Sequence, residues 1–159
     1  MERVIHEIPP IYDENSKILI LGSFPSVKSR ESQFFYGHPQ NRFWRTLANL
    51  FDETTPQGID EKRAFLLRHG IALWDVIASC EITGSSDASI KHAVANDLSV
   101  ILKNAPVKRI ITNGATAHKL YCRYRACGVD GMHFRGHTGL FSRTSDNVSY
   151  GDFSDYRGC

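Results

Sequence analysis

Three short apolar runs, separated by segments of helical periodicity, limit the fold more than any other feature of this sequence. The runs cover residues 17–22, 71–76 and 107–112, and apolar runs of this length that end at glycine or polar residues are typical of buried strands. Apolar residues recur at helical spacing in four other segments, about residues 39–51, 61–69, 90–102 and 115–127. Strands that alternate with helices predict an α/β fold, a three-layer α/β/α sandwich with a mainly parallel central sheet.

The length and composition are those of one compact domain. The chain has 159 residues and a hydrophobic fraction of 42%, and no repeat or low-complexity linker divides it. The formal net charge of +2 is low for a protein that coats nucleic acid, so DNA binding would need positive charge concentrated on one face. No apolar run is long enough to cross a bilayer and the N-terminus lacks an apolar signal region, so we expect a cytoplasmic protein without membrane contact.

The cysteines and histidines show no metal-binding pattern. The four cysteines include no CxxC pair, and the seven histidines do not combine with them at zinc-ligand spacing. We therefore expect free thiols, as is usual in the cytoplasm, together with no metal and no cofactor.

A ligand site is expected at the carboxyl ends of the predicted strands, as in other doubly wound α/β folds. The first such end is Gly22-Ser23-Phe24-Pro25-Ser26, which opens a long loop over residues 23–40. A glycine and a proline directly after a buried strand form a rigid turn whose amides can face a ligand. The alternative is an ordinary turn between a strand and a loop.

The segment HPQNRFW, residues 38–44, places polar groups beside aromatic groups at a predicted helix start. Its polar members are His38, Asn41 and Arg42, and its aromatic members are Phe43 and Trp44. These residues either form part of a functional site or have structural roles. In the structural alternative, Asn41 caps the helix and the aromatic residues belong to the core.

The order of these segments resembles the uracil-DNA glycosylase superfamily. The turn GSFPS, the stretch FFYGHPQNRFW, and then LWDV and GSSDASIK are similar to its hypoxanthine-DNA (deoxyinosine) glycosylase branch, and HPxNRFW also occurs in the mismatch-specific branch. The resemblance covers about residues 15–125. It implies a monofunctional enzyme that flips a deaminated base, hypoxanthine or uracil, out of DNA and hydrolyses the N-glycosidic bond without metal or cofactor.

Asn41 is the catalytic residue that the resemblance implies. Other branches place a polar catalytic residue in the turn after the first strand, where this chain has Phe24. In the hypoxanthine branch, the asparagine of HPxNRFW supplies that function. The neutral amide of Asn41 would hold the attacking water and donate a hydrogen bond to the departing base. Phe43 would stack on the flipped base and so offset part of the cost of unstacking it.

The resemblance and the strand ends together give two sets of binding residues. The base-binding set is Gly22, Ser23, Phe24, Pro25, Tyr36, His38, Phe43 and Asn113. The set expected at the DNA backbone is Ser26, Lys28, Arg42 and Ser86. For the basic residues near the expected site, Lys28, Arg30 and Arg42, surface solubility is an equally weighted alternative.

Several alternatives stay open at the level of the sequence. Asn113 offers donors and an acceptor that suit the edge of a base, or it forms only a turn with Gly114. Asp75 could orient a residue of the site, and Asp87 is expected to cap the following helix rather than to contact phosphate. The alternative functions are a G:U/T mismatch-specific uracil-DNA glycosylase and an inactive nucleic-acid-binding α/β module. The sequence does not define an oligomeric state.

The tail over about residues 131–159 departs from the family. The resemblance predicts a Leu-Pro-Ser/Thr-Thr-Ser-Pro-like loop and a final helix, whereas this segment has little periodicity and almost no aliphatic residues after Leu140. Codons can be chosen for residues 144–151 such that the same DNA, read in a frame shifted by one base, encodes Leu-Pro-Thr-Thr-Ser-Pro-Thr. We interpret the segment as a frameshifted or truncated tail of a single domain that spans residues 1–159.

Overall fold

The computed structural model describes residues 1–124 and 136–139, and its centre is a four-stranded parallel sheet. The order of the strands is β3 (Ile71–Asp75), β2 (Ile18–Gly22), β6 (Arg109–Asn113) and β7 (Gly136–Gly139). Every neighbouring pair in this sheet is parallel. The strands predicted from the three apolar runs are confirmed, and so is the α/β class with a mainly parallel central sheet.

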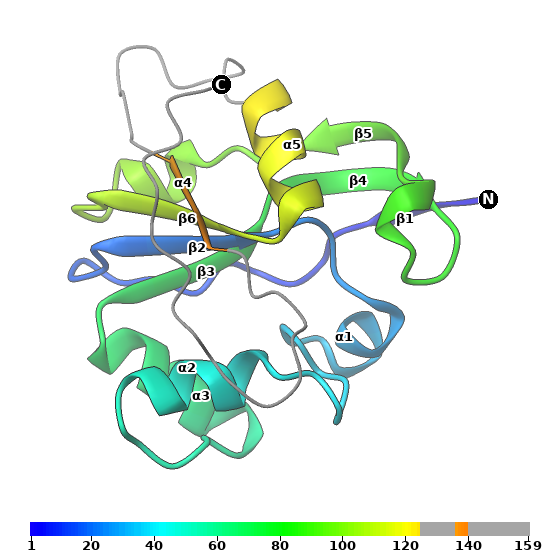
Figure 1. Cartoon of the computed structure of the whole chain (residues 1–159). Coiled ribbons are helices and arrows are strands. Elements are labelled where there is room, and N and C mark those ends of the chain that lie inside the picture. The colour runs from blue at the N-terminus through cyan, green and yellow to red at the C-terminus, as the bar shows by residue number, and fades with distance from the viewer. Residues whose placement is uncertain (125–135, 140–159) are drawn as a thin grey trace.

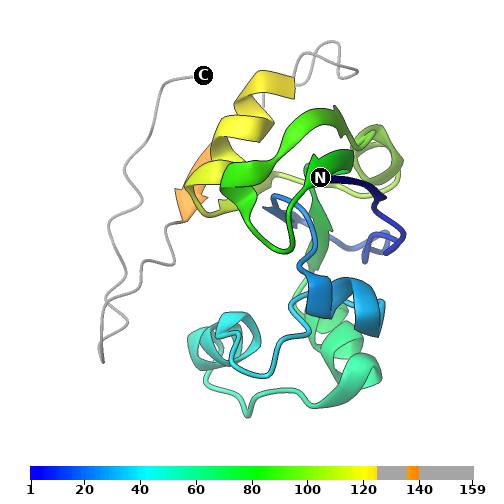
Figure 2. The same ribbon diagram turned by 90° about the vertical axis from the view of Figure 1, so that its right-hand side faces the viewer.

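Helices lie on both sides of the parallel sheet (Figures 1 and 2). One side carries α1 (Val27–Ser32), α2 (Phe43–Leu50) and α3 (Gly58–Arg68), and the other carries α4 (Ser99–Leu102) and α5 (Ala115–Tyr124). Side chains alternate along β2 and divide the core accordingly. Ile20 packs with residues of α2 and α3, whereas Leu19 and Leu21 pack with residues of α4 and α5.

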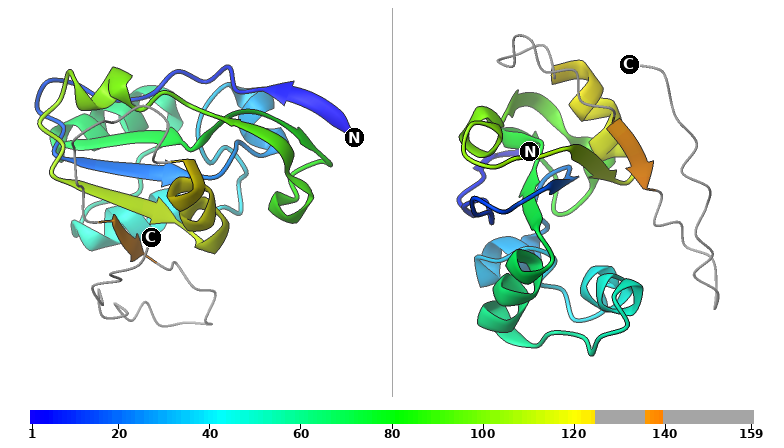
Figure 3. Two further views of the ribbon diagram at one scale, coloured as in Figure 1. Left: turned by 90° about the horizontal axis from the view of Figure 1, so that it is seen from above. Right: turned by 90° about the vertical axis from the view of Figure 1, so that its left-hand side faces the viewer.

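A second sheet of three antiparallel strands was not expected from the sequence. Its order is β1 (Glu2–Ile5), β4 (Ile77–Ile82) and β5 (Lys91–Ala95). A single residue, Val76, separates β3 from β4, so the chain passes directly from one sheet into the other. The view from above shows β2 and β6 of the parallel sheet pointing in the same direction, with β4 and β5 beyond their ends (Figure 3).

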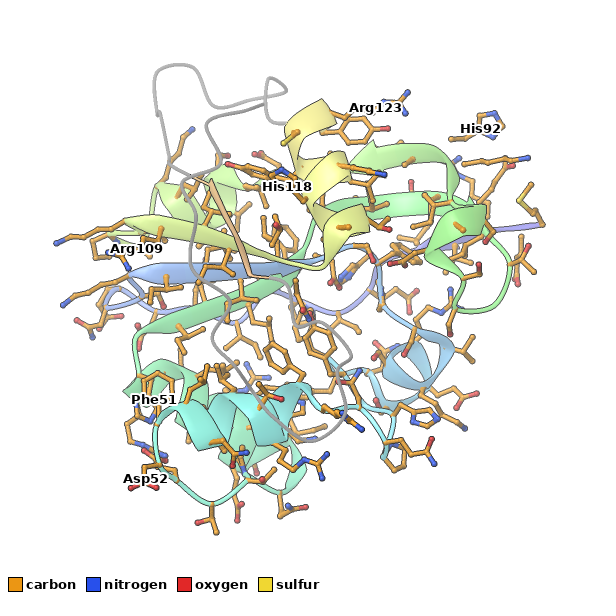
Figure 4. All side chains as sticks on the ribbon, in the orientation of Figure 1. Phe51, Asp52, His92, Arg109, His118 and Arg123 are labelled. Carbon is orange, nitrogen blue, oxygen red and sulfur yellow. The ribbon has the colours of Figure 1, made fainter. Side chains whose placement is uncertain are left out.

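The helix predicted over residues 90–102 is wrong. Residues 91–95 form β5 because their backbone pairs with β4, with Ala95 opposite Ile77 and a bulge within the pairing. His92 has a φ of 48°, a left-handed conformation that does not occur inside an α-helix, and its side chain points outward (Figure 4). Helix α4 is the helical part of the segment.

Three smaller predictions also need correction. The expected loop over residues 23–40 contains α1, and the helix expected from residue 61 begins at Gly58. Cys80 is a free and buried thiol, as expected. Cys122 is disulfide-bonded, so the expectation of free thiols is wrong for this residue.

The tail contributes to the described fold at one place. Residues 136–139 form β7, which pairs with β6 and is the outer strand of the parallel sheet. Residues 125–135 and 140–159, which include the rest of the tail interpreted as frameshifted, lie outside the described residues. Within the described ranges, none of the helices combines the length and the apolar character needed to span a membrane.

Candidate active site

The carboxyl ends of β2, β3 and β6 bring the three expected ligand-binding positions to one edge of the sheet. Gly22 at the end of β2 lies opposite Asp75 at the end of β3, and Leu21 lies opposite Thr112 of β6, one residue before Asn113. Arg109 marks the far end of β6, away from this edge (Figure 4). The carboxyl end of β3 therefore carries the Asp75 carboxylate.

Gly22 allows two polar side chains to lie directly over the end of β2. A Cβ atom at this position would be 2.3 Å from Oδ1 of Asp75 and 2.9 Å from the hydroxyl oxygen of Tyr36. Both distances are shorter than a van der Waals contact, so only glycine leaves room for this arrangement. Asp75 itself is 3% exposed. Gly22 thus has a steric role in the site.

His6 holds the buried carboxylate and was not identified from the sequence. Nε2 of His6 donates to Oδ2 of Asp75 at 2.7 Å, and the His6 side chain is 1% exposed. The imidazole lies among the rings of Phe24, Phe35 and Trp74, at centroid distances of 6.0, 6.1 and 6.4 Å. Nδ1 of His6 is buried and accepts or donates no hydrogen bond among the described residues. The Asp75–His6 pair is therefore enclosed by aromatic rings.

Tyr36 links the ends of the strands to the HPQNRFW segment. Nδ2 of Asn113 donates to the Tyr36 hydroxyl at 3.0 Å, and the Tyr36 ring stacks on Phe43 at a centroid distance of 4.1 Å. Burial, with a further contribution from the negative charge of Asp75, raises the pKa of Tyr36 well above its usual range. The φ of Tyr36 is 51°, an uncommon conformation for a bulky residue. Asn113 therefore does more than form a turn, because it fixes this phenol.

The two aromatic residues expected to meet a base are both largely buried. Phe43 is 5% exposed, with one face on Tyr36 and an edge-to-face contact to Trp44 at 5.0 Å. Phe24 is 7% exposed and lies beneath the guanidinium group of Arg30, 5.9 Å from the ring centroid. Both rings therefore belong to the hydrophobic core beside the site.

The Asn41 side chain bonds to the backbone at the start of α2, but the N-cap residue of this helix is Arg42, so the structural alternative in which Asn41 caps the helix is wrong. Asn41 is exposed, and its Oδ1 accepts a hydrogen bond from the backbone N–H of Phe43 at 2.9 Å. Its own N–H donates to the carbonyl of His38 at 2.9 Å, and Nδ1 of His38 accepts from the N–H of Gln40. No described residue bonds to Nδ2 of Asn41. One end of the carboxamide is therefore fixed, and the other is open to a ligand.

A second carboxylate, Asp87, reaches the turn after β2. The hydroxyl of Ser23 donates to Oδ2 of Asp87 at 2.8 Å. Asp87 starts the short helix η1 (Asp87–Ser89), whose N-cap residue is Ser86, so the prediction that Asp87 caps a helix is wrong. Burial raises the pKa of Asp87, and the charge of Asp75 adds to this effect.

The residues expected at the DNA backbone have mixed environments. Ser26 caps α1 by accepting from the N–H of Ser29, and Lys28 pairs with Glu31 at 2.9 Å on the surface. Arg42 and Ser86 are exposed. Arg30 is less available than expected, because Nη2 donates to the carbonyl of Gly84. The remaining base-binding candidate, Pro25, is buried in the turn after β2.

Asp87→Asn is expected to stabilise the protein near neutral pH. The pKa of Asp87 is raised in the folded protein, so ionisation of its carboxyl group opposes folding above the pKa that it has when unfolded. Asparagine still accepts the hydrogen bond from Ser23. The Tm of the variant should exceed that of the wild type by a few degrees near neutral pH, and the difference should shrink as the pH falls through the folded-state pKa. A difference that grows toward acidic pH would contradict this assignment.

A family model and two known proteins place the chain in a family. The sequence matches the family model described as the uracil DNA glycosylase superfamily over residues 9–151. A hypoxanthine DNA glycosylase of Methanosarcina acetivorans is 36% identical over 141 residues, which cover 87% of this chain and 89% of that protein. A hypoxanthine DNA glycosylase of Methanosarcina barkeri is 37% identical over 125 residues, which cover 77% of this chain and 78% of that protein.

A solved structure agrees with these relatives in fold. The solution NMR structure of a Methanosarcina acetivorans protein, named as a candidate uracil DNA glycosylase, superposes with a TM-score of 0.66 at 35% sequence identity. The match covers 75% of each chain. The family expected from the segments GSFPS and HPQNRFW is thereby confirmed. This chain belongs to the uracil DNA glycosylase superfamily.

Proposed function

We propose that this protein is a monofunctional DNA glycosylase that removes deaminated bases, hypoxanthine first and uracil second. The observation that carries the proposal is the convergence of Asp75, Tyr36 and Asn113 over the end of β2, beside the aromatic pair that Tyr36 forms with Phe43. The two Methanosarcina relatives, named as hypoxanthine DNA glycosylases, support the choice of hypoxanthine. Its substrate is DNA, and we propose a cytoplasmic localisation.

The proposed reaction requires a flipped base and a positioned water. Extrusion of a nucleotide costs a few kcal/mol and is cheapest for a mispaired base, which favours deaminated bases in DNA. The open amide nitrogen of Asn41 can donate to the departing base or hold the water, and Asn113 can meet the edge of the base. The catalytic and base-binding residues include no lysine, so water is the nucleophile and an abasic site is the product.

The test is the release of free base from a panel of DNA substrates. Duplexes of one sequence would carry hypoxanthine, uracil or thymine opposite a pairing or a mismatched base, and single strands would carry the same three bases. The wild-type protein would be assayed for multiple turnovers. We expect release of hypoxanthine to be fastest. Preference for uracil or thymine in mismatches would instead support a mismatch-specific glycosylase. DNA binding without release of any base would support an inactive nucleic-acid-binding module.

Phe43 provides a test of base capture. Phe43→Tyr keeps an aromatic face, whereas Phe43→Leu keeps apolar volume without one, so leucine is expected to weaken substrate capture more strongly. The expected difference is about 10-fold in kcat/KM, since base stacking contributes roughly 1–3 kcal/mol. Leucine is preferable to alanine because Phe43 is buried against Tyr36 and Trp44, and a cavity there would itself be costly. Equal activity of two folded variants would exclude stacking as its role.

A further inference from the structure

We propose that the Asp75 carboxylate is a catalytic group that stabilises positive charge on the sugar as the glycosidic bond breaks, and that His6 positions it. This inference rests on the proposed glycosylase function and adds a residue to it. It assigns a use to a buried carboxylate that lies at the ligand-binding edge of the sheet. The turn after β2 has no carboxylate of its own, and Asp75 brings one there from the neighbouring strand.

The carboxylate is held in a fixed position. The N–H of Val76 donates to the carbonyl of Gly22 at 2.8 Å, and the N–H of Ile77 donates to the carbonyl of Ser23 at 3.1 Å. Nδ2 of Asn96 donates to the carbonyl of Asp75 at 2.9 Å. These bonds tie the backbone of Asp75 to the turn after β2, while His6 holds Oδ2. Oδ1 is left over Gly22, and no described residue donates a hydrogen bond to it.

The charge on Asp75 has no cation beside it. Within the described part of the chain, its ion-pair partner is His6, and no lysine or arginine lies within 4.0 Å. A buried carboxylate without a cation is costly to maintain. Asp87 adds a second carboxyl group nearby, whose raised pKa already reflects the charge of Asp75. Negative charge at this place also opposes the binding of DNA, which is itself an anion.

A charge that disfavours both folding and substrate binding is explained if it acts in the transition state. Cleavage of a glycosidic bond passes through a sugar with oxocarbenium character, which a nearby carboxylate stabilises. The bond from C1′ to the base breaks with its electron pair leaving on the base, and the oxygen of water bonds to C1′. The proton lost by water ends on the base or in solvent. Asp75 begins and ends the reaction ionised.

Two abasic-site analogues of similar shape provide the test. A duplex with a neutral tetrahydrofuran and one with a cationic pyrrolidine at the same position would be bound to the full-length wild type and its variants. We expect the wild type to bind the pyrrolidine duplex at least about 10-fold more tightly, since the cation resembles the charged sugar. Asp75→Asn should lose this preference, bind the tetrahydrofuran duplex no more weakly than the wild type, and cleave a hypoxanthine duplex about 10²–10³-fold more slowly in single turnovers.

Asp87→Asn is the matched control, because it removes the second carboxyl group that reaches the turn after β2. It should keep the preference for pyrrolidine. Absence of the preference in the wild type, its survival in Asp75→Asn, or an equal loss in Asp87→Asn would each overturn the inference. If Asp75→Asn does not fold, His6→Ala replaces it, since it frees the carboxylate to move and should reduce the preference. Failure of the wild type to release any base would instead count against the proposed function.

Discussion

Asn41→Ala is expected to slow the chemical step of base excision about 10²–10³-fold, the effect of losing one preorganised group at a transition state. The structure adds a complication, because Oδ1 of Asn41 also accepts from the N–H of Phe43 at the start of α2. Alanine therefore also removes this hydrogen bond, at a cost of about 1 kcal/mol in the free energy of unfolding. The rate would be measured in single turnovers with saturating protein on a hypoxanthine duplex.

Asn41→Ser separates the hydrogen bond to the start of α2 from the catalytic role. Serine keeps an oxygen acceptor for the N–H of Phe43, but it lacks the amide. We expect its Tm to stay near that of the wild type while its chemical step is as slow as that of Asn41→Ala. A serine variant with nearly the activity of the wild type would show that the hydrogen bond to Phe43 is what matters at this position.

Gly22→Ala is expected to lower activity at least about 100-fold, although it adds a single methyl group. The new Cβ would lie 2.3 Å from Oδ1 of Asp75 and 2.9 Å from the hydroxyl of Tyr36, so both groups must move. Displacing a reacting group by about 1 Å is enough for a loss of this size. Overpacking should also lower the free energy of unfolding by about 1–3 kcal/mol, measurable by denaturant titration.

The double variant Gly22→Ala/Asp75→Ala tests the steric explanation. Removing the carboxylate leaves room for the methyl group, so the double variant should recover part of the stability that Gly22→Ala loses. It should not recover activity. If the two substitutions instead destabilise additively, the clash with Asp75 is not the cause of the loss.

The strands and the edge that carries the site were predictable from the sequence for a local reason. The parallel strands β2 and β3 are short apolar runs, and β6 has an apolar centre at Ile110 and Ile111; such patterns are visible without knowledge of the fold. The carboxyl ends of parallel strands then meet at one edge, which brings Gly22, Asp75 and Asn113 together. This inference requires only that the strands run parallel, and it does not require knowledge of their side-chain contacts.

The partners of the site residues were not predictable, because they come from distant parts of the chain. His6 and Asp75 are separated by 69 positions, and Ser23 and Asp87 by 64. Neither His6 nor Asp87 stands in a pattern that would distinguish it from a surface residue or a cap. The helix prediction for residues 90–102 was wrong for a related reason. Their apolar residues have helical spacing, but backbone pairing with β4 makes residues 91–95 a strand.

The support of the site by β1 also concerns how this protein should be handled in the laboratory. The first six residues look dispensable, because β1 lies at the outer edge of its sheet near the free N-terminus (Figure 1). His6, which directly follows β1, nevertheless donates the hydrogen bond that holds the Asp75 carboxylate. Trimming these residues, or fusing a bulky tag so that β1 detaches from β4, would release the carboxylate without touching any residue of the strand ends. Affinity tags are therefore better cleaved off completely before rates are compared.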